Sequence, residues 1–109
     1  MNILKVTIPA GETTSAAVSL NDNVPVALII PDIFTGSTVA FKVSVDGVRL
    51  FSMKAVDDGS AAYTVKVAEG VYIPLLYTLW VGVNWIQIVS NATETADRVI
   101  QLVTRTTLT

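Results

Sequence analysis

The chain has 109 residues, which is enough for one domain with a buried core and too few for two. Apolar residues make up 51% of it, and this excludes a disordered chain, because disorder requires low hydrophobicity and high net charge. The formal net charge of −2 shows no basic excess of the kind that favours nucleic acid binding. The sequence has neither Cys nor His, which excludes disulfides, Cys/His zinc sites and the usual Ser-His or Cys-His nucleophile pairs.

Short alternating or wholly apolar runs, separated by turn residues, follow one another along the chain and predict strands. Turn clusters lie at 9–12, 21–23, 55–60 and 91–96, and the segment 31–36 leaves a buried strand as a loop with at most one helical turn. The apolar segment 74–81 fits either a short helix or a crossing loop. The predicted strands are 3–8, 15–20, 24–30, 38–45, 48–54, 61–67, 71–73, 82–90 and 97–107.

The strongest local signal is a hairpin from Thr38 to Lys54 around Asp46 and Gly47. A two-residue type I′ turn needs positive φ at both central positions, and Asp-Gly suits it. The expected pairs are Val45 with Val48, Val43 with Leu50, and Phe41 with Ser52. Alternation then assigns to the core face Val39, Phe41, Val43, Val45, Val48 and Leu50. It assigns to the other face Ala40, Lys42, Ser44, Arg49, Phe51 and Met53.

Eight or nine short strands with hardly any helical periodicity indicate an all-β, antiparallel sandwich or small barrel, in one domain over residues 1–109. The segment from Gly70 to Thr93 has no charged residue and is long enough to cross a bilayer. Its polar residues and its alternating second half favour core strands over a membrane span.

Few residues suggest chemistry. Asp57 and Asp58 are adjacent acids that could serve glycoside hydrolysis, but beside Gly59 they are more typical of a turn. Arg98 stands on an otherwise apolar strand face, where a charge is costly unless it is paired. It is expected either to be solvated at the sheet end or to pair with an acid from a nearby loop, such as Asp57 or Asp58, and so tie two loops together. Neither a cofactor nor a metal is expected, and enzymatic activity is not expected.

Only 15% of the residues are charged, against roughly 25% in an average soluble domain, so part of the surface is expected to be covered by other chains. Four large aromatic residues could form a sugar-stacking platform, although core or interface positions are more usual for them: Tyr72, Tyr77, Trp80 and Trp85. The residues expected at a protein interface are Phe51, Met53, Tyr72, Leu76, Tyr77 and Trp80.

Three stretches resemble small β-sandwich virion proteins of tailed bacteriophages: PDIFTGSTVAFKVSVDG, GVNWIQIVSN and ADRVIQLVTR. The resemblance covers roughly residues 3 to 106 and is greatest to jelly-roll-like capsid cement (decoration) proteins. It implies a homo-oligomer, typically a trimer, made in the host cytoplasm and bound to the major capsid protein on the virion exterior. It brings no catalytic residues. The alternative is a carbohydrate-binding module of a phage tail or baseplate.

Overall fold

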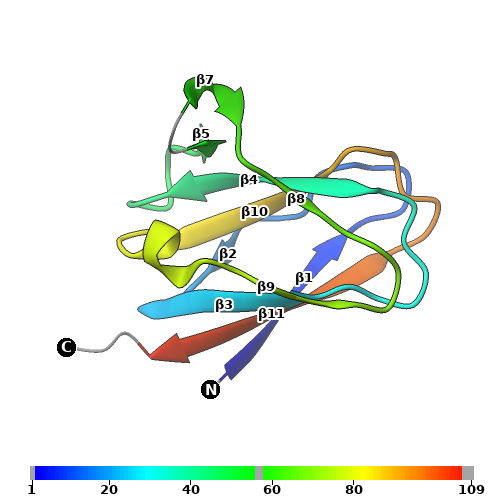
Figure 1. The fold of residues 1–109 in the computed structure, drawn as a ribbon, viewed down its shortest axis with the longest axis horizontal. Helices are drawn as coiled ribbons and strands as arrows, with labels where there is room; N and C mark the ends of the chain where they lie inside the picture. The colour runs from blue at the N-terminus through cyan, green and yellow to red at the C-terminus, as the bar shows by residue number, and fades with distance from the viewer. Residues whose placement is uncertain (1, 56–57, 107–109) are drawn as a thin grey trace.

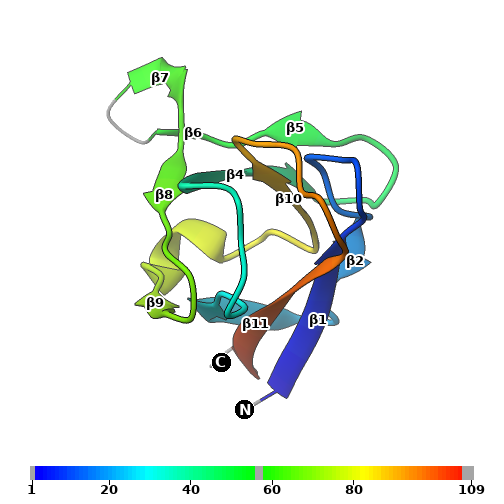
Figure 2. The same cartoon turned by 90° about the vertical axis from the view of Figure 1, so that its right-hand side faces the viewer.

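The computed structural model describes residues 2–55 and 58–106. Within that part of the chain, the secondary structure consists of eleven strands and one short 3-10 helix. Two antiparallel sheets pack face to face, and a small hairpin projects beside them (Figures 1 and 2). The fold is therefore an all-β sandwich, as predicted.

The lower sheet in Figure 1 has four strands in the order β1-β11-β3-β9. Its strands are β1 (Asn2–Ile8), β11 (Arg98–Thr106), β3 (Asn23–Ile29) and β9 (Tyr72–Pro74). A bulge lies between Val103 and Thr104, where β11 pairs with β3. Strand β1 forms one edge of the sheet and β9 forms the other.

The upper sheet has five strands, with β4 paired to β10 on one side and to both β5 and β8 on the other. Its strands are β2 (Val18–Ser19), β10 (Trp85–Ser90), β4 (Thr38–Ser44), β5 (Phe51–Ser52) and β8 (Thr64–Lys66). Between β5 and β8 the chain makes the projecting hairpin of β6 (Lys54–Ala55) and β7 (Asp58–Ala62). This hairpin occupies part of the segment 55–60, which was predicted to be a loop.

The order of the strands is that of a jelly roll. When β5 and β8 are counted as one interrupted strand, eight strands remain. Along the chain, each strand is followed by a strand of the opposite sheet, except that β4 is followed by β5, its neighbour in the same sheet. The orders β1-β11-β3-β9 and β2-β10-β4-β5 are the two four-strand halves of a doubly folded Greek key. The jelly-roll-like architecture is confirmed.

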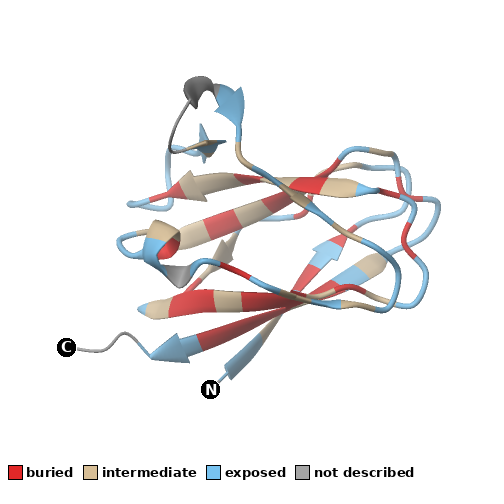
Figure 3. Cartoon of the chain, in the orientation of Figure 1, coloured by how far each residue is buried: buried red, intermediate tan, exposed pale blue. Residues whose placement is uncertain are grey.

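The core lies between the two sheets, where inward side chains alternate with outward ones (Figure 3). The short helix η1 (Tyr77–Trp80) closes one side of it and inserts Trp80 edge-on against Phe41, with ring centroids 4.8 Å apart. No helix in the described residues is long and apolar enough to span a membrane. Fully buried apolar side chains include Trp80, Phe41, Ile8, Leu20, Leu28, Ile30, Ile86, Ile88, Ile100 and Leu102.

The hairpin after β4 forms, but its predicted register is wrong by one residue. Val43 pairs with Phe51 rather than with Leu50, and Lys42 pairs with Ser52. A shift of one residue exchanges the two faces of a strand. The exchange turns Leu50 away from the core, and Val45 and Val48 lie in the loop between β4 and β5. All three were expected in the core, and Val45, Val48 and Leu50 are exposed by 70%, 87% and 36%.

The cause of the shift is the side chain of Asp46. Its Oδ1 accepts hydrogen bonds from the backbone N–H groups of Val48 and Arg49, at 2.9 and 3.1 Å, and from the Ser44 hydroxyl. Gly47 has a positive φ of 79°, but Asp46 is not among the residues with positive φ, so the two-residue type I′ turn does not form. An Asp-closed loop over residues 44–50 replaces it.

Candidate interaction surfaces

One end of the sandwich is held together by Glu94, a fully buried acid that sequence reasoning missed. We call it the braced end; it comprises the loops 9–14, 31–37 and 91–97, at the right of Figure 1. The Glu94 carboxylate accepts hydrogen bonds from the backbone N–H groups of Thr35 (2.9 Å) and Gly36 (3.1 Å). It also accepts from the Ser90 hydroxyl (3.2 Å) and from Arg98 Nε (3.0 Å).

The backbone of Glu94 joins the third loop to the same point. Its carbonyl accepts from the N–H of Gly11 at 2.7 Å, and its N–H donates to the carbonyl of Glu12 at 3.1 Å. Burial opposes ionisation of Glu94, but the hydrogen bonds from Thr35, Arg98, Gly36 and Ser90 outweigh it and hold its pKa below the ordinary value. The group is therefore a carboxylate at neutral pH, and its negative charge is matched by Arg98.

The predicted pairing of Arg98 with an acid from a nearby loop is confirmed, but the two acids named as examples are wrong. The acid is Glu94, four residues earlier, rather than Asp57 or Asp58. The Arg98 side chain is only 11% exposed, so the alternative that Arg98 is solvated at the sheet end is wrong. Asp57 lies outside the described residues, and Asp58 belongs to β7. The described residues contain no group of three or more Cys, His, Asp or Glu side chains that could hold a metal ion.

The loop before β4 is held through five consecutive backbone N–H groups, from residues 34 to 38. Glu69 accepts from the first, Glu94 from the next two, and the Asn91 side-chain oxygen from the last two. Side-chain oxygens thus accept the hydrogen bonds that the carbonyl groups of a neighbouring strand would accept in a sheet. Buried backbone N–H groups need such partners. The braced end is a structural device that fixes the loops.

We expect Gly36→Ala to destabilise the protein by about 1–3 kcal/mol, because an added Cβ would lie 2.2 Å from Ser90 Oγ and 3.0 Å from Asn91 Oδ1. Chemical denaturation of the variant measures the loss. Thr35→Ala is the control, since its side chain is exposed and its N–H bond to Glu94 is kept. Equal stability of Gly36→Ala and wild type would contradict the tight packing described here.

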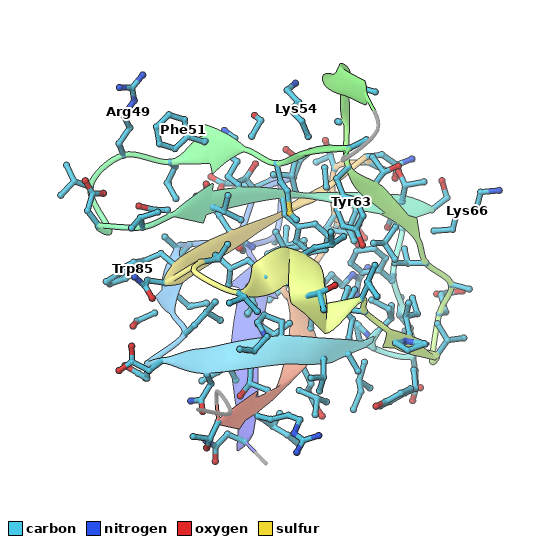
Figure 4. All side chains as sticks on the ribbon, turned by 60° about the vertical axis from the view of Figure 1, so that its left-hand side comes forward. Arg49, Phe51, Lys54, Tyr63, Lys66 and Trp85 are labelled. Carbon is cyan, nitrogen blue, oxygen red and sulfur yellow. The ribbon has the colours of Figure 1, made fainter. Side chains whose placement is uncertain are left out.

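The opposite end carries four exposed apolar side chains on the loop after β4 and at the start of β5: Val45, Val48, Leu50 and Phe51, which we call the tip patch. Besides the Asp46 bonds, the Asn84 side-chain amide donates to the Val45 carbonyl at 2.9 Å. The Arg49 guanidinium lies 4.7 Å from the centroid of the Phe51 ring, and both side chains stand at the outer rim in Figure 4. The tip patch is an apolar surface on a loop whose backbone is well held.

The N–H donors of Val48 and Arg49, with the Ser44 hydroxyl, lower the pKa of Asp46. Gly47 packs directly on the indole of Trp85, since a Cβ there would lie 2.6 Å from the indole Nε1. Its positive φ and this close approach both require glycine. Trp85 is thus half-covered by the same loop that presents the tip patch (Figure 4).

A second apolar surface is the outer face of the four-stranded sheet. The strand registers arrange its outward side chains in rows across all four strands. The first row is Ile3, Val103, Ala27 and Pro74, and the second is Lys5, Gln101, Ile29 and Tyr72. A shorter third row is Thr7 and Val99. Ile3 is 55% and Tyr72 62% exposed, whereas outward faces of sandwiches are usually polar.

The six predicted interface residues do not form one patch. Phe51 belongs to the tip patch, Tyr72 lies on the outer face of the four-stranded sheet, and Leu76 is exposed just before η1. Met53 is half-buried against the core. Trp80 corrects the prediction, because it has no exposed surface and belongs to the core. Tyr77 lies in η1, and its side chain is outside what the structure describes.

The sugar-stacking platform is not assembled from the aromatic residues whose side chains are described. Trp80 is in the core, Tyr72 faces outward from one sheet, and Trp85 lies on the other sheet beneath Gly47.

The signal that could have revealed Glu94 is its spacing four residues before Arg98, a cation on an apolar face.

Comparisons with models of known protein families, with curated proteins and with solved structures find no match for this chain.

Proposed function

We propose that the chain is a structural virion protein, a capsid cement protein that binds the outside of a phage capsid shell and bridges neighbouring subunits. The tip patch carries this proposal, because it presents apolar side chains from a loop held by Asp46 and Asn84. Contiguous exposed apolar groups are typical of protein contact sites. The resemblance to cement proteins supplies the class of partner, the major capsid protein, and the expectation of three copies at each position.

The proposed mechanism is the addition of buried area across the seams of the shell. The jelly roll provides a rigid body, with the braced end held by Glu94 and the tip patch at the other end. The patch contacts the capsid surface, so disruption of the shell must also break these contacts. Because the contact recurs at many equivalent positions, a modest free energy for each contact gives a large cooperative stabilisation of the shell.

Co-sedimentation with capsids that lack the protein tests the proposal. The wild-type chain is expected to saturate at many equivalent sites, and a Val45→Asp, Val48→Asp variant is expected to bind at least ten-fold more weakly. Ile33→Asp is the matched control, because Ile33 is 63% exposed on the braced end, away from the tip patch. Binding of the tip variant as strong as that of the control would contradict the assigned surface. Failure of the wild type to bind, or a few copies at a tail, would contradict the proposed function.

A further inference from the structure

We propose that the outer face of the four-stranded sheet is a self-association surface, on which a second copy of this chain packs face to face about a two-fold axis parallel to the strands. The strand registers, the exposure of Ile3 and Tyr72 and the position of Lys5 support this pairing, and none of them depends on capsid binding. It assigns an occupant to the rows that run from β1 across to β9.

The composition of the face favours another protein surface over water. The residues of the three rows are apolar apart from Lys5, Gln101 and Thr7, and the charged Arg105 is exposed on β11 two residues beyond Val103. Val103 and Ala27 are already buried at the centre, while Ile3 and Tyr72 remain exposed on either side. None of the residues in the three rows is acidic, so Lys5 has no opposite charge within these rows.

The rows are complementary to themselves under the proposed symmetry. A two-fold axis parallel to the strands and midway between β11 and β3 places β1 of each copy over β9 of the other. Each row then meets the same row in reverse order. In the second row Lys5 lies over the Tyr72 ring of the other copy, a favourable cation–π arrangement. In the first row Val103 lies over Ala27, a larger side chain over a smaller one.

Lys5 discriminates against two other ways of pairing this region. A two-fold axis perpendicular to the strands, passing through the second row, would place Lys5 over Lys5. Antiparallel pairing of two β1 edges centred on the same residue would also set the two Lys5 side chains opposite each other. Like charges directly opposite are unfavourable. The parallel axis alone gives Lys5 an aromatic partner.

The contact is small, which determines how it should be measured. Four strands at about 4.8 Å spacing and seven residues at about 3.4 Å rise would give a face of roughly 19 by 24 Å, and this is an upper bound because β9 has only three residues. Two such faces bury at most roughly 900 Å² in total, which is below the standard size for a stable complex. The pairs are therefore expected to be concentration-dependent and are best trapped covalently.

The chain contains no Cys, so single introduced thiols are unique labels. Facing sheets lie about 10 Å apart, too far for a disulfide but within reach of a short bismaleimide cross-linker such as bismaleimidoethane. We expect a mixture of the Lys5→Cys and Tyr72→Cys chains to form the mixed cross-link at least ten-fold faster than either variant links to itself. Both positions are exposed, so both variants should fold, and their melting curves verify this.

The control mixture pairs Tyr72→Cys with Val48→Cys, which is exposed on the tip patch rather than on this face. Cross-linking of the control at the same rate as the Lys5→Cys and Tyr72→Cys mixture would overturn the proposal. Rapid linking of Lys5→Cys to itself would also overturn it, in favour of pairing through β1. Since no capsid is present, these results are independent of the co-sedimentation test.

Discussion

Replacement of Glu94 by Ala is expected to destabilise the protein by about 3–5 kcal/mol, the usual effect of removing one partner of a buried ion pair. The change would leave Arg98 uncompensated at 11% exposure, and would remove the acceptor for the N–H groups of Thr35 and Gly36. Urea denaturation followed by Trp fluorescence measures the loss. Glu12→Gln is the control, since Glu12 is an exposed acid on a neighbouring loop, and its cost should stay within about 0.5 kcal/mol.

The pH dependence of stability gives an independent readout of the same group. Because the folded-state pKa of Glu94 is lowered below its ordinary value of 4.5, the contribution of Glu94 to stability is complete above that value and is lost as the pH falls through the lower, folded-state pKa. The stability difference between wild type and Glu94→Gln should therefore be constant near neutral pH and shrink below about pH 4.5. A difference that grows on acidification would contradict the assigned ionisation.

Replacement of Trp80 by Ala is expected to cost about 3–5 kcal/mol of stability, because its fully buried indole packs against Phe41 and Tyr63. Trp80→Phe should cost distinctly less, since the indole Nε1 is buried without a hydrogen-bond partner in the described structure and no bond is lost. Thermal and chemical denaturation separate the two variants. If Trp80 were instead an interface residue, Trp80→Ala would change association while leaving the stability of the chain unaltered.

The fold class was predictable because alternation is a direct record of which side chains face the core. In β1 and β11, the residues that alternate in the sequence, such as Val6, Ile8 and Ile100, are the ones that the structure buries. The jelly-roll order was not visible in alternation. It was reached through the resemblance, and the strand pairings confirm it.

The wrong or missing predictions concern loops in which a polar side chain, rather than the backbone, accepts hydrogen bonds from backbone N–H groups. Asp46 suggested a type I′ turn, but its carboxylate bonds the N–H groups of Val48 and Arg49 and lengthens the loop, so the register shifts. Glu94 stands in a polar loop with no periodic signal, and its role depends on two segments distant in sequence, the loops 9–14 and 31–37. Both cases depend on hydrogen-bond geometry that a pattern of apolar and polar residues does not contain.

The candidate surfaces were only partly predictable for the same reason. Low charge predicts that other chains cover part of the surface, and this stays a prediction, whereas Phe51 and Tyr72 were rightly expected to be exposed. Their separation onto two surfaces follows from the topology, which places β5 and β9 in different sheets. The tip patch could not be found, because Val45, Val48 and Leu50 read as core in the expected register.

The most direct test of the proposed role is the temperature at which capsids break open, measured with and without the saturating chain. We expect wild type to raise it, and the Val45→Asp, Val48→Asp variant to leave it at the value of undecorated shells at the same chain concentration. Ile33→Asp should protect as well as wild type does, because it leaves the tip patch intact. Bound wild-type chain that leaves the temperature unchanged would contradict a cementing role, and protection by the tip variant would contradict the surface assigned to it.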